Sequence, residues 1–153
     1  MRIVALLLLL CSCARNDSWT ARSIQTGSPE FDSSKISYKS QDRAQGLDLE
    51  IFQVGGLTHA YFQVQSHTIA PYEGNPKNAL LTFVIGENTY SDVALRHEGG
   101  QRVSLSDKMQ QLLLSSLQKN LSVAVRLGTF ETIIKAEKFT KYYTEGKSPQ
   151  GAL

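Results

Sequence analysis

The sequence predicts a mainly β fold, a small antiparallel β-sandwich or barrel of about six or seven strands with one helix packed on it. Three observations favour this class. Residues 47–143 contain short runs that alternate apolar and polar side chains, glycine pairs separate several of these runs, and a single segment has helical periodicity. No strand–helix–strand alternation and no repeat of about 20–50 residues occurs, so we expect an antiparallel sheet.

The first thirteen residues, MRIVALLLLLCSC, are typical of an export signal. One cation, Arg2, precedes an apolar run over residues 3–10, and the small residue Ser12 stands directly before Cys13. The apolar run is too short to cross a bilayer core about 30 Å thick, which requires roughly 20 residues. We therefore predict a signal peptide over residues 1–12.

The end of this leader, Leu10-Cys11-Ser12-Cys13, resembles the lipobox of bacterial lipoproteins. In that family a leucine stands three positions before the cysteine, a small residue directly before it, and the cysteine thiol carries a diacylglycerol. The resemblance implies that Cys13 is the lipidated first residue of the mature chain and that the lipid attaches it to a membrane. Cys11 occupies a position where the family usually has Ala, Ser, Thr or an aliphatic residue. In lipoproteins of diderm bacteria, a residue such as Ala14 after the cysteine implies delivery to the outer membrane of the cell envelope.

Two other interpretations of the leader stay open. Ser12 and Ala14 also form a small-x-small site, and cleavage after Ala14 would release a soluble secreted protein. Alternatively, the leader is a chance apolar start of a cytosolic protein.

Composition indicates one ordinary globular domain. The chain has 153 residues, 16 basic and 14 acidic, and 41% of its residues are hydrophobic. Because no basic patch follows from this balance, we do not expect nucleic acid as a partner. Both cysteines, Cys11 and Cys13, lie at the leader, so we expect neither a disulfide in the domain nor a cysteine metal cluster.

Residues 13–46 are mostly polar, and their few apolar side chains follow no lasting period. This composition predicts a flexible polar tether after Cys13, to which residues 34–40 add at most a short edge strand.

The β-rich domain is predicted over residues 47–143. Strands at 47–54 and 57–70 are joined by a hairpin at Gly55 and Gly56, because two glycines accept the positive φ of a tight turn. In the first strand Leu47, Leu49 and Ile51 share one face, and Asp48 and Glu50 share the other. Residues 79–86 are predicted to be a central strand buried on both faces, and residues 89–97 a strand with Val93 on its inner face.

The one predicted helix begins at Ser104 or Ser106 and ends at Asn120. Its apolar stripe is interpreted as core and consists of Met109, Leu112, Leu113, Ser116 and Leu117. Residues 121–139 return to β character with a bend at Gly128, aromatic residues up to Tyr143 dock a last half-turn, and residues 144–153 are a disordered tail.

The sequence contains no recognised catalytic or nucleotide-binding motif. Ser91, Asp92 and His97 have the composition of a catalytic triad, but a triad is recognised by geometry, which the sequence does not give. The histidines lack partners at metal-ligand spacing, so we expect no metal and no cofactor. A polar recognition face on the outer side of the second strand is the best candidate site, against the alternative of an ordinary solvent-facing surface. It comprises His59, Tyr61, Gln63, Gln65 and His67.

Together these observations favour a non-enzymatic envelope lipoprotein that binds or scaffolds an unidentified envelope protein or glycan. The alternatives are a hydrolase or sugar-active enzyme that uses the strand histidines, and a soluble secreted binding protein.

Overall fold

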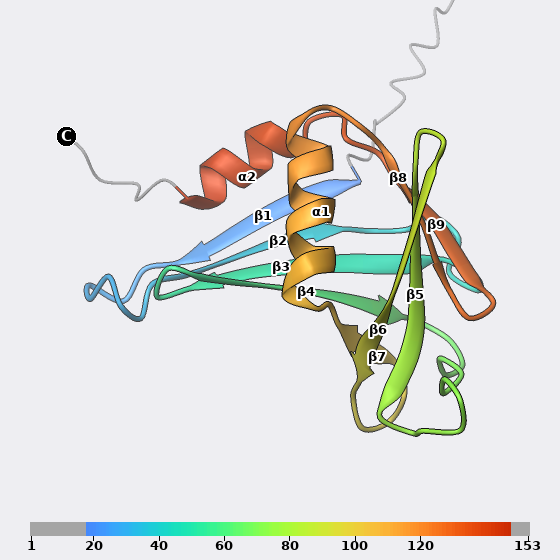
Figure 1. The fold of residues 1–153 in the computed structure, drawn as a ribbon. Coiled ribbons are helices and arrows are strands. Elements are labelled where there is room, and N and C mark those ends of the chain that lie inside the picture. Colours follow the sequence, from blue (N-terminus) through green and yellow to red (C-terminus); the bar gives the residue numbers. More distant parts are fainter. Residues whose placement is uncertain (1–17, 148–153) are drawn as a thin grey trace, which may run out of the picture.

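The computed structural model describes residues 18–147, and within them nine strands form a single antiparallel sheet with two helices (Figure 1). The strand order across the sheet is β1-β2-β3-β4-β7-β6-β5-β8-β9. The predicted leader, 1–12, and Cys13 lie outside the described residues. The elements are β1 (Trp19–Ile24), β2 (Ser33–Tyr38), β3 (Leu47–Val54), β4 (Leu57–Val64), β5 (Asn78–Ile85), β6 (Asn88–Arg96), β7 (Arg102–Ser104), α1 (Asp107–Gln118), β8 (Val123–Leu127), β9 (Phe130–Ile134) and α2 (Phe139–Lys147).

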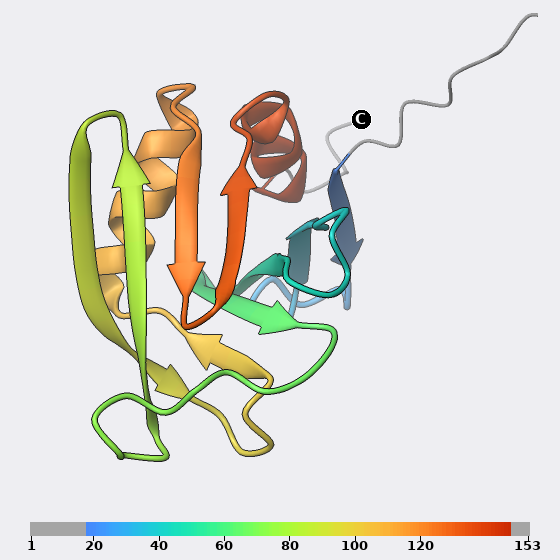
Figure 2. The same cartoon turned by 90° about the vertical axis from the view of Figure 1, so that its right-hand side faces the viewer.

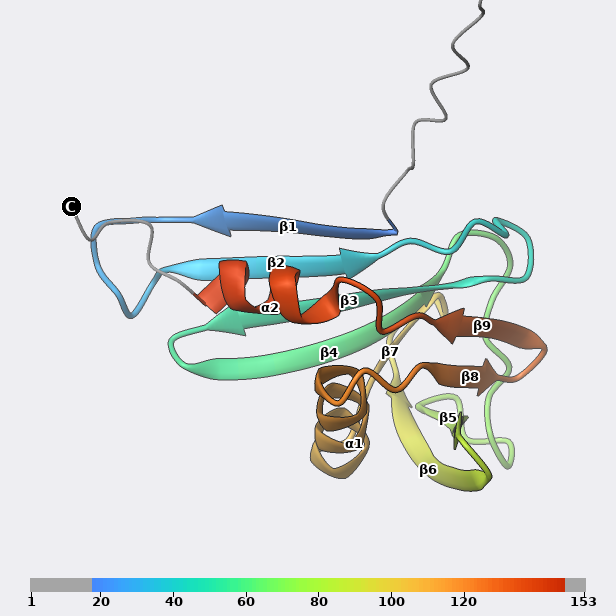
Figure 3. The ribbon, with the colours of Figure 1, turned by 90° about the horizontal axis from the view of Figure 1, so that it is seen from above.

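The sheet is strongly bent, so that β5, β6, β8 and β9 run across the direction of β1–β4, and both helices lie on its inner side (Figures 1 and 2). α2 packs against β1 and β2, and Figure 3 shows it running along β2 when the molecule is seen from above. The inner side holds the hydrophobic core, whose largest fully buried side chains include Phe62, Phe83, Phe139, Met109 and Leu117.

The mainly β class is confirmed, but the strand number and the closure of the sheet were predicted wrongly. Within residues 18–147 the sheet has nine strands rather than six or seven, and it is open. At its β9 edge, individual hydrogen bonds replace the strand pairing that closure would require. The Tyr38 hydroxyl donates to the carbonyl of Ile133, and the N–H of Glu131 donates to the carbonyl of Gln45.

The prediction of a flexible tether over 13–46 is wrong for its described part, residues 18–46. β1 and β2 pair with each other, and β2 pairs with β3, so β2 lies inside the sheet and β1 forms its edge. The scattered apolar residues Trp19, Ile36 and Tyr38 all enter the core. Each contributes a large buried surface, which offsets the ordering of an otherwise polar segment.

The β3–β4 hairpin is as predicted, with Gly55 and Gly56 at φ 56° and 80°. β5 lies inside the sheet, but it is buried on one face only, and Leu80 on the other face is half-exposed. In β6 the predicted orientation is reversed: Val93 faces outward, whereas Ala94 is buried. The two-residue turn that sets Ile85 opposite Asn88 fixes this register, and a register fixes the side of every residue in a strand.

α1 has the predicted cap and core stripe. The Ser106 hydroxyl accepts a hydrogen bond from the N–H of Met109, and Asn120 ends the helix region at φ 61°. The chain then forms a second helix, α2, where only a half-turn was predicted. α2 buries Phe139 and Tyr143 against the sheet and extends to Lys147, so the predicted tail begins in a helix and its remainder, 148–153, lies outside the described residues.

Candidate functional site

The outer face of β1–β4 and β7 carries a continuous cluster of charged and aromatic side chains. Residues directly opposite one another in antiparallel strands share a face, so the strand register defines its members. Glu50 stands between Ser37 and Tyr61, and Tyr61 in turn stands opposite Ser104. We call this surface the charged face. The strand register places on it Thr20, Arg22, Lys35, Ser37, Asp48, Glu50, Phe52, His59, Tyr61, Gln63, Arg102 and Ser104, and Lys39 joins it through its bond to Asp48.

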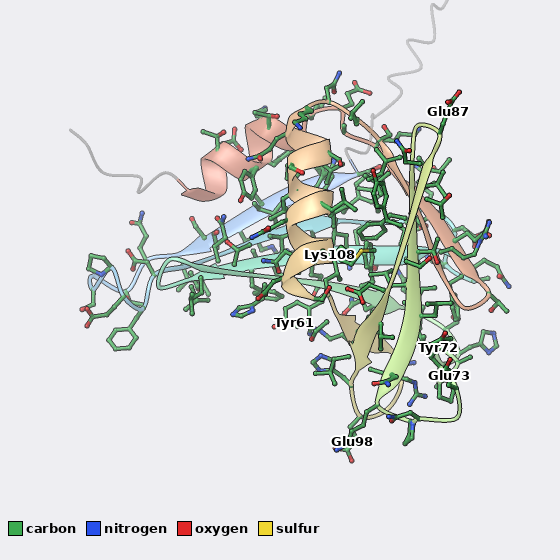
Figure 4. The ribbon with its side chains drawn as sticks, viewed as in Figure 1. Tyr61, Tyr72, Glu73, Glu87, Glu98 and Lys108 are labelled. Atoms are coloured by element: carbon green, nitrogen blue, oxygen red, sulfur yellow. The ribbon has the colours of Figure 1, made fainter. Side chains whose placement is uncertain are left out.

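The predicted polar recognition face is only partly assembled in the structure. Tyr61 and Gln63 lie half-buried at the centre of the charged face, and His59 is exposed on its flank. Tyr61 points away from the side of β4 on which α1 lies (Figure 4). Gln65 follows the end of β4 and reaches back to Asp48, whereas His67 sits exposed in a turn at φ 65°. β4 ends at Val64, so the predicted alternation does not extend to His67.

Glu50 is a buried carboxylate held by two cations. Its side chain is 5% exposed and lies 2.5 Å from the Lys35 ammonium and 3.5 Å from the Arg102 guanidinium. The two cations are 38% and 35% exposed. Burial of a charge is costly unless it is paired, which explains why both cations lie over this carboxylate. The positive ends therefore reach solvent while the negative charge stays below them.

Asp48 lies two residues before Glu50 on the same face of β3 and is also a buried carboxylate paired with a cation. Its side chain is 1% exposed, and it accepts hydrogen bonds of 2.9 Å from the Lys39 ammonium, the N–H of Ser40 and the Gln65 amide. Lys39 is 52% exposed. The sequence placed Asp48 and Glu50 on the correct side of β3. It could not show that they are buried, because the covering side chains come from other elements.

Aromatic rings support the cations of the charged face. The Arg102 guanidinium lies 4.0 Å from the centroid of the Tyr61 ring, and the Lys35 ammonium lies 5.2 Å from that of Phe52. These distances fall within cation–π range. The Arg102 Nε is buried and has no hydrogen-bond partner among the described residues, so its position depends on the ring beneath it and on Glu50.

A histidine and a serine meet at the β7 side of the charged face. His97 Nε2 lies 2.5 Å from the Ser104 hydroxyl, and the His97 ring packs edge-on against Tyr61 with centroids 5.8 Å apart. This pair resembles two members of a catalytic triad, but the structure shows no carboxylate bonded to His97 among residues 18–147.

The sequence's own triad candidates are not brought together. Ser91 exchanges a hydrogen bond with Thr82, and Asp92 accepts one of 2.7 Å from Ser106. The Ser106 hydroxyl, and secondly the N–H of Val93, lower the pKa of Asp92 from its ordinary value. Asp92 thus fixes the start of α1. It lies on the opposite side of β6 from Leu95, which stands opposite Ser104, the hydrogen-bond partner of His97.

Next to His97 the surface has an open depression of about 580 Å³ between the β6–β7 hairpin and the loop that precedes β5. Leu95 and Lys77 line it together with His97. The Arg96 side chain holds its wall by donating to the carbonyls of Ile69 and Pro76. The depression adjoins the charged face at Ser104, which lies opposite Leu95 and contacts His97.

Two further features of the described residues bear on function. Across residues 18–147 no helix is long and apolar enough to span a membrane. Over the same range no three or more His, Cys, Asp or Glu side chains are grouped so that they could hold a metal ion.

We compared the chain with models of protein families, with characterised proteins and with solved structures. None of the three comparisons gave a match. The function is therefore inferred from the chemistry of the chain's own residues.

Proposed function

We propose that this chain is a lipid-anchored, non-enzymatic protein of a bacterial envelope that binds an acidic envelope component through the charged face. The lipobox residues Leu10, Ser12 and Cys13 support the anchor. The observation that carries the binding part is the layering of charge, in which exposed cations cover buried carboxylates.

This layering determines which sign of charge a partner meets. The charged face carries two carboxylates, Asp48 and Glu50, which are nearly inaccessible to solvent. It also carries four cations, which are Arg22, Lys35, Lys39 and Arg102. Complementary charge steers association and selects against partners of the same sign. The aromatic base beneath Lys35 and Arg102 holds these groups in place, so less side-chain entropy is lost on binding.

Binding is tested by calorimetric titration of the purified acylated protein, in detergent micelles, with poly-L-glutamate and with alginate as acidic probes. Arg22→Gln and Lys35→Gln together should weaken binding by about tenfold, or about 1.4 kcal/mol. Arg22→Gln alone, which leaves the buried carboxylates paired, should weaken it less and excludes an effect of misfolding.

The matched control is Arg126→Gln, because Arg126 is an exposed, ion-paired arginine on β8, outside the charged face. It should leave the affinity unchanged. If the control weakens binding as much as the charged-face variants do, or if neither probe binds the wild type, the proposed binding face is refuted.

A hydrolase is the second candidate, and the short contact between His97 and Ser104 is the observation that favours it. An activated serine reacts with a fluorophosphonate probe because the adjacent base removes its proton. Labelling that disappears in Ser104→Ala would support the hydrolase. The binding function predicts no labelling at Ser104.

A further inference from the structure

We infer that one defined end of the domain faces a bilayer that contains anionic phospholipid, and that the charged face is turned away from it. This inference rests on the proposed lipid anchor at Cys13. It concerns the end of the domain where β1 begins, α1 ends and α2 begins, which we call the anchor end (Figure 1). The anchor end comprises Trp19, residues 119–122 and residues 135–141.

Hydrogen bonds and ring contacts tie the anchor end to the start of β1. The Trp19 indole donates a hydrogen bond of 2.9 Å to the carbonyl of Lys135, and its ring packs 5.0 Å from that of Phe139. The N–H of Ala136 donates to the Ser122 hydroxyl, which places the turn after α1 beside the start of α2. Trp19 therefore contacts the start of α2 directly, and the end of α1 lies beside it through the bond between Ser122 and Ala136.

The chain between Cys13 and Trp19 is too short to let the domain stand clear of a membrane. The two residues are six positions apart in the sequence. Six fully extended residues span at most about 20 Å, because each contributes about 3.3–3.6 Å. A 33-residue tether would let the domain rotate freely above the surface, whereas six residues keep Trp19 within about 20 Å of the lipid head groups.

The chemistry of the anchor end suits such a surface. Lys119, Lys135, Lys138 and Lys141 are exposed there, and Leu121 is 48% exposed beside them. Glu137 belongs to the same end, and Glu87 at the tip of the β5–β6 hairpin points the same way (Figure 4). Among the described residues of this end, four cations against two carboxylates leave a positive excess, which attracts the end to an anionic leaflet.

The opposite end of the molecule, which carries Glu98, provides a position far from the anchor end for comparison. Glu98, at the tip of the β6–β7 hairpin, lies far from the end of α1 in the same view (Figure 4). Tyr61 lies on the side of β4 away from α1 (Figure 4). With the anchor end at the bilayer, the charged face thus opens away from the lipid, where an envelope partner can reach it.

The test uses the acylated protein in vesicles of phosphatidylethanolamine and phosphatidylglycerol that carry an energy acceptor on some head groups. The natural cysteines are Cys11 and Cys13, so an introduced cysteine is the one free thiol once Cys13 is acylated and the leader removed. Leu121→Cys and Glu98→Cys are each labelled with a donor fluorophore. We expect several-fold stronger energy transfer from position 121 than from position 98.

Intact mass of the same samples separates the possible failures. A mass without lipid at Cys13 would refute the proposed anchor. Acylated protein with equal transfer from both positions, or with stronger transfer from position 98, would overturn the orientation while the anchor stands.

A second arm tests the lysines. The triple change Lys119→Glu, Lys135→Glu and Lys141→Glu should lower transfer from position 121 in vesicles with phosphatidylglycerol, and should have little effect in phosphatidylcholine. An equal effect in both lipids, or none in either, would overturn the role assigned to anionic lipid.

Discussion

The Trp19 indole donates a hydrogen bond to the carbonyl of Lys135, a residue 116 positions further along the chain. The bond joins the edge strand β1 to the connection between β9 and α2. The Trp19 ring also lies 4.9 Å from that of Tyr38 and 5.0 Å from that of Phe139. Through these contacts a segment of polar composition becomes part of the domain.

Trp19→Ala should therefore lower the free energy of unfolding by about 3–5 kcal/mol, as expected for removal of a buried aromatic side chain. Thr20→Ala changes the exposed neighbour in the same strand and should stay within about 0.5 kcal/mol of wild type. Urea unfolding monitored by circular dichroism measures both. Equal stability of the two variants would mean that β1 is not docked and that residues 18–46 behave as a tether.

The buried carboxylate of Glu50 should matter to stability far more than an exposed one. Glu50→Gln leaves Lys35 and Arg102 without a counter-charge, and it should cost about 1–3 kcal/mol because both cations can partly rehydrate. Glu131→Gln is the matched control, since Glu131 pairs with Arg126 at 63% and 62% exposure. It should cost less than about 1 kcal/mol. A control variant that is as unstable as Glu50→Gln would contradict the layering of charge on this face.

Asp92 should make stability depend on pH in the acid range. Its folded-state pKa is lowered, chiefly by the Ser106 hydroxyl, so the ionised carboxylate stabilises the folded chain above its unfolded pKa of about 3.9. That contribution is lost as pH falls through the lower folded pKa. Thermal unfolding of wild type and Asp92→Asn should thus differ most above about pH 5 and converge toward about pH 2. A difference that grows on acidification would contradict this sign.

The hairpins and α1 could be predicted from sequence because each is defined by local residues. Gly55 and Gly56 require a turn, and Ser106 and Asn120 mark the ends of a helix. β1, and the position of β2 inside the sheet rather than at its edge, could not be predicted, because the burial of both strands depends on partners such as Phe139 from the far end of the chain. The position of β7 between β4 and β6 is likewise a tertiary property that no local pattern records.

The candidate site was only half predictable for the same reason. Alternation correctly placed Tyr61 and Gln63 on the outer side of β4. It also placed Glu50 on the outer side of β3, but it could not show that Lys35 and Arg102 would cover it. One signal was available in the sequence. Two acidic residues, Asp48 and Glu50, lie on the same face of β3, and an ordinary solvent-facing strand does not require such a pair.

Cys13→Ala should separate anchoring from folding. The change lies outside the described domain, so circular dichroism and unfolding of the purified protein should match wild type. In detergent phase partitioning, the wild type should enter the detergent phase because acyl chains contribute about 0.8 kcal/mol per buried CH₂. The variant should leave that phase, unless an uncleaved leader retains it, which its intact mass will reveal.

The most direct test of a lipid-anchored domain is the intact mass of the mature protein isolated from membranes, with fragmentation of its N-terminal peptide. We predict a chain that begins at Cys13 and carries a diacylglycerol on the thiol of that residue. A mature chain that begins elsewhere, or that begins at Cys13 with a free thiol, would contradict the central claim.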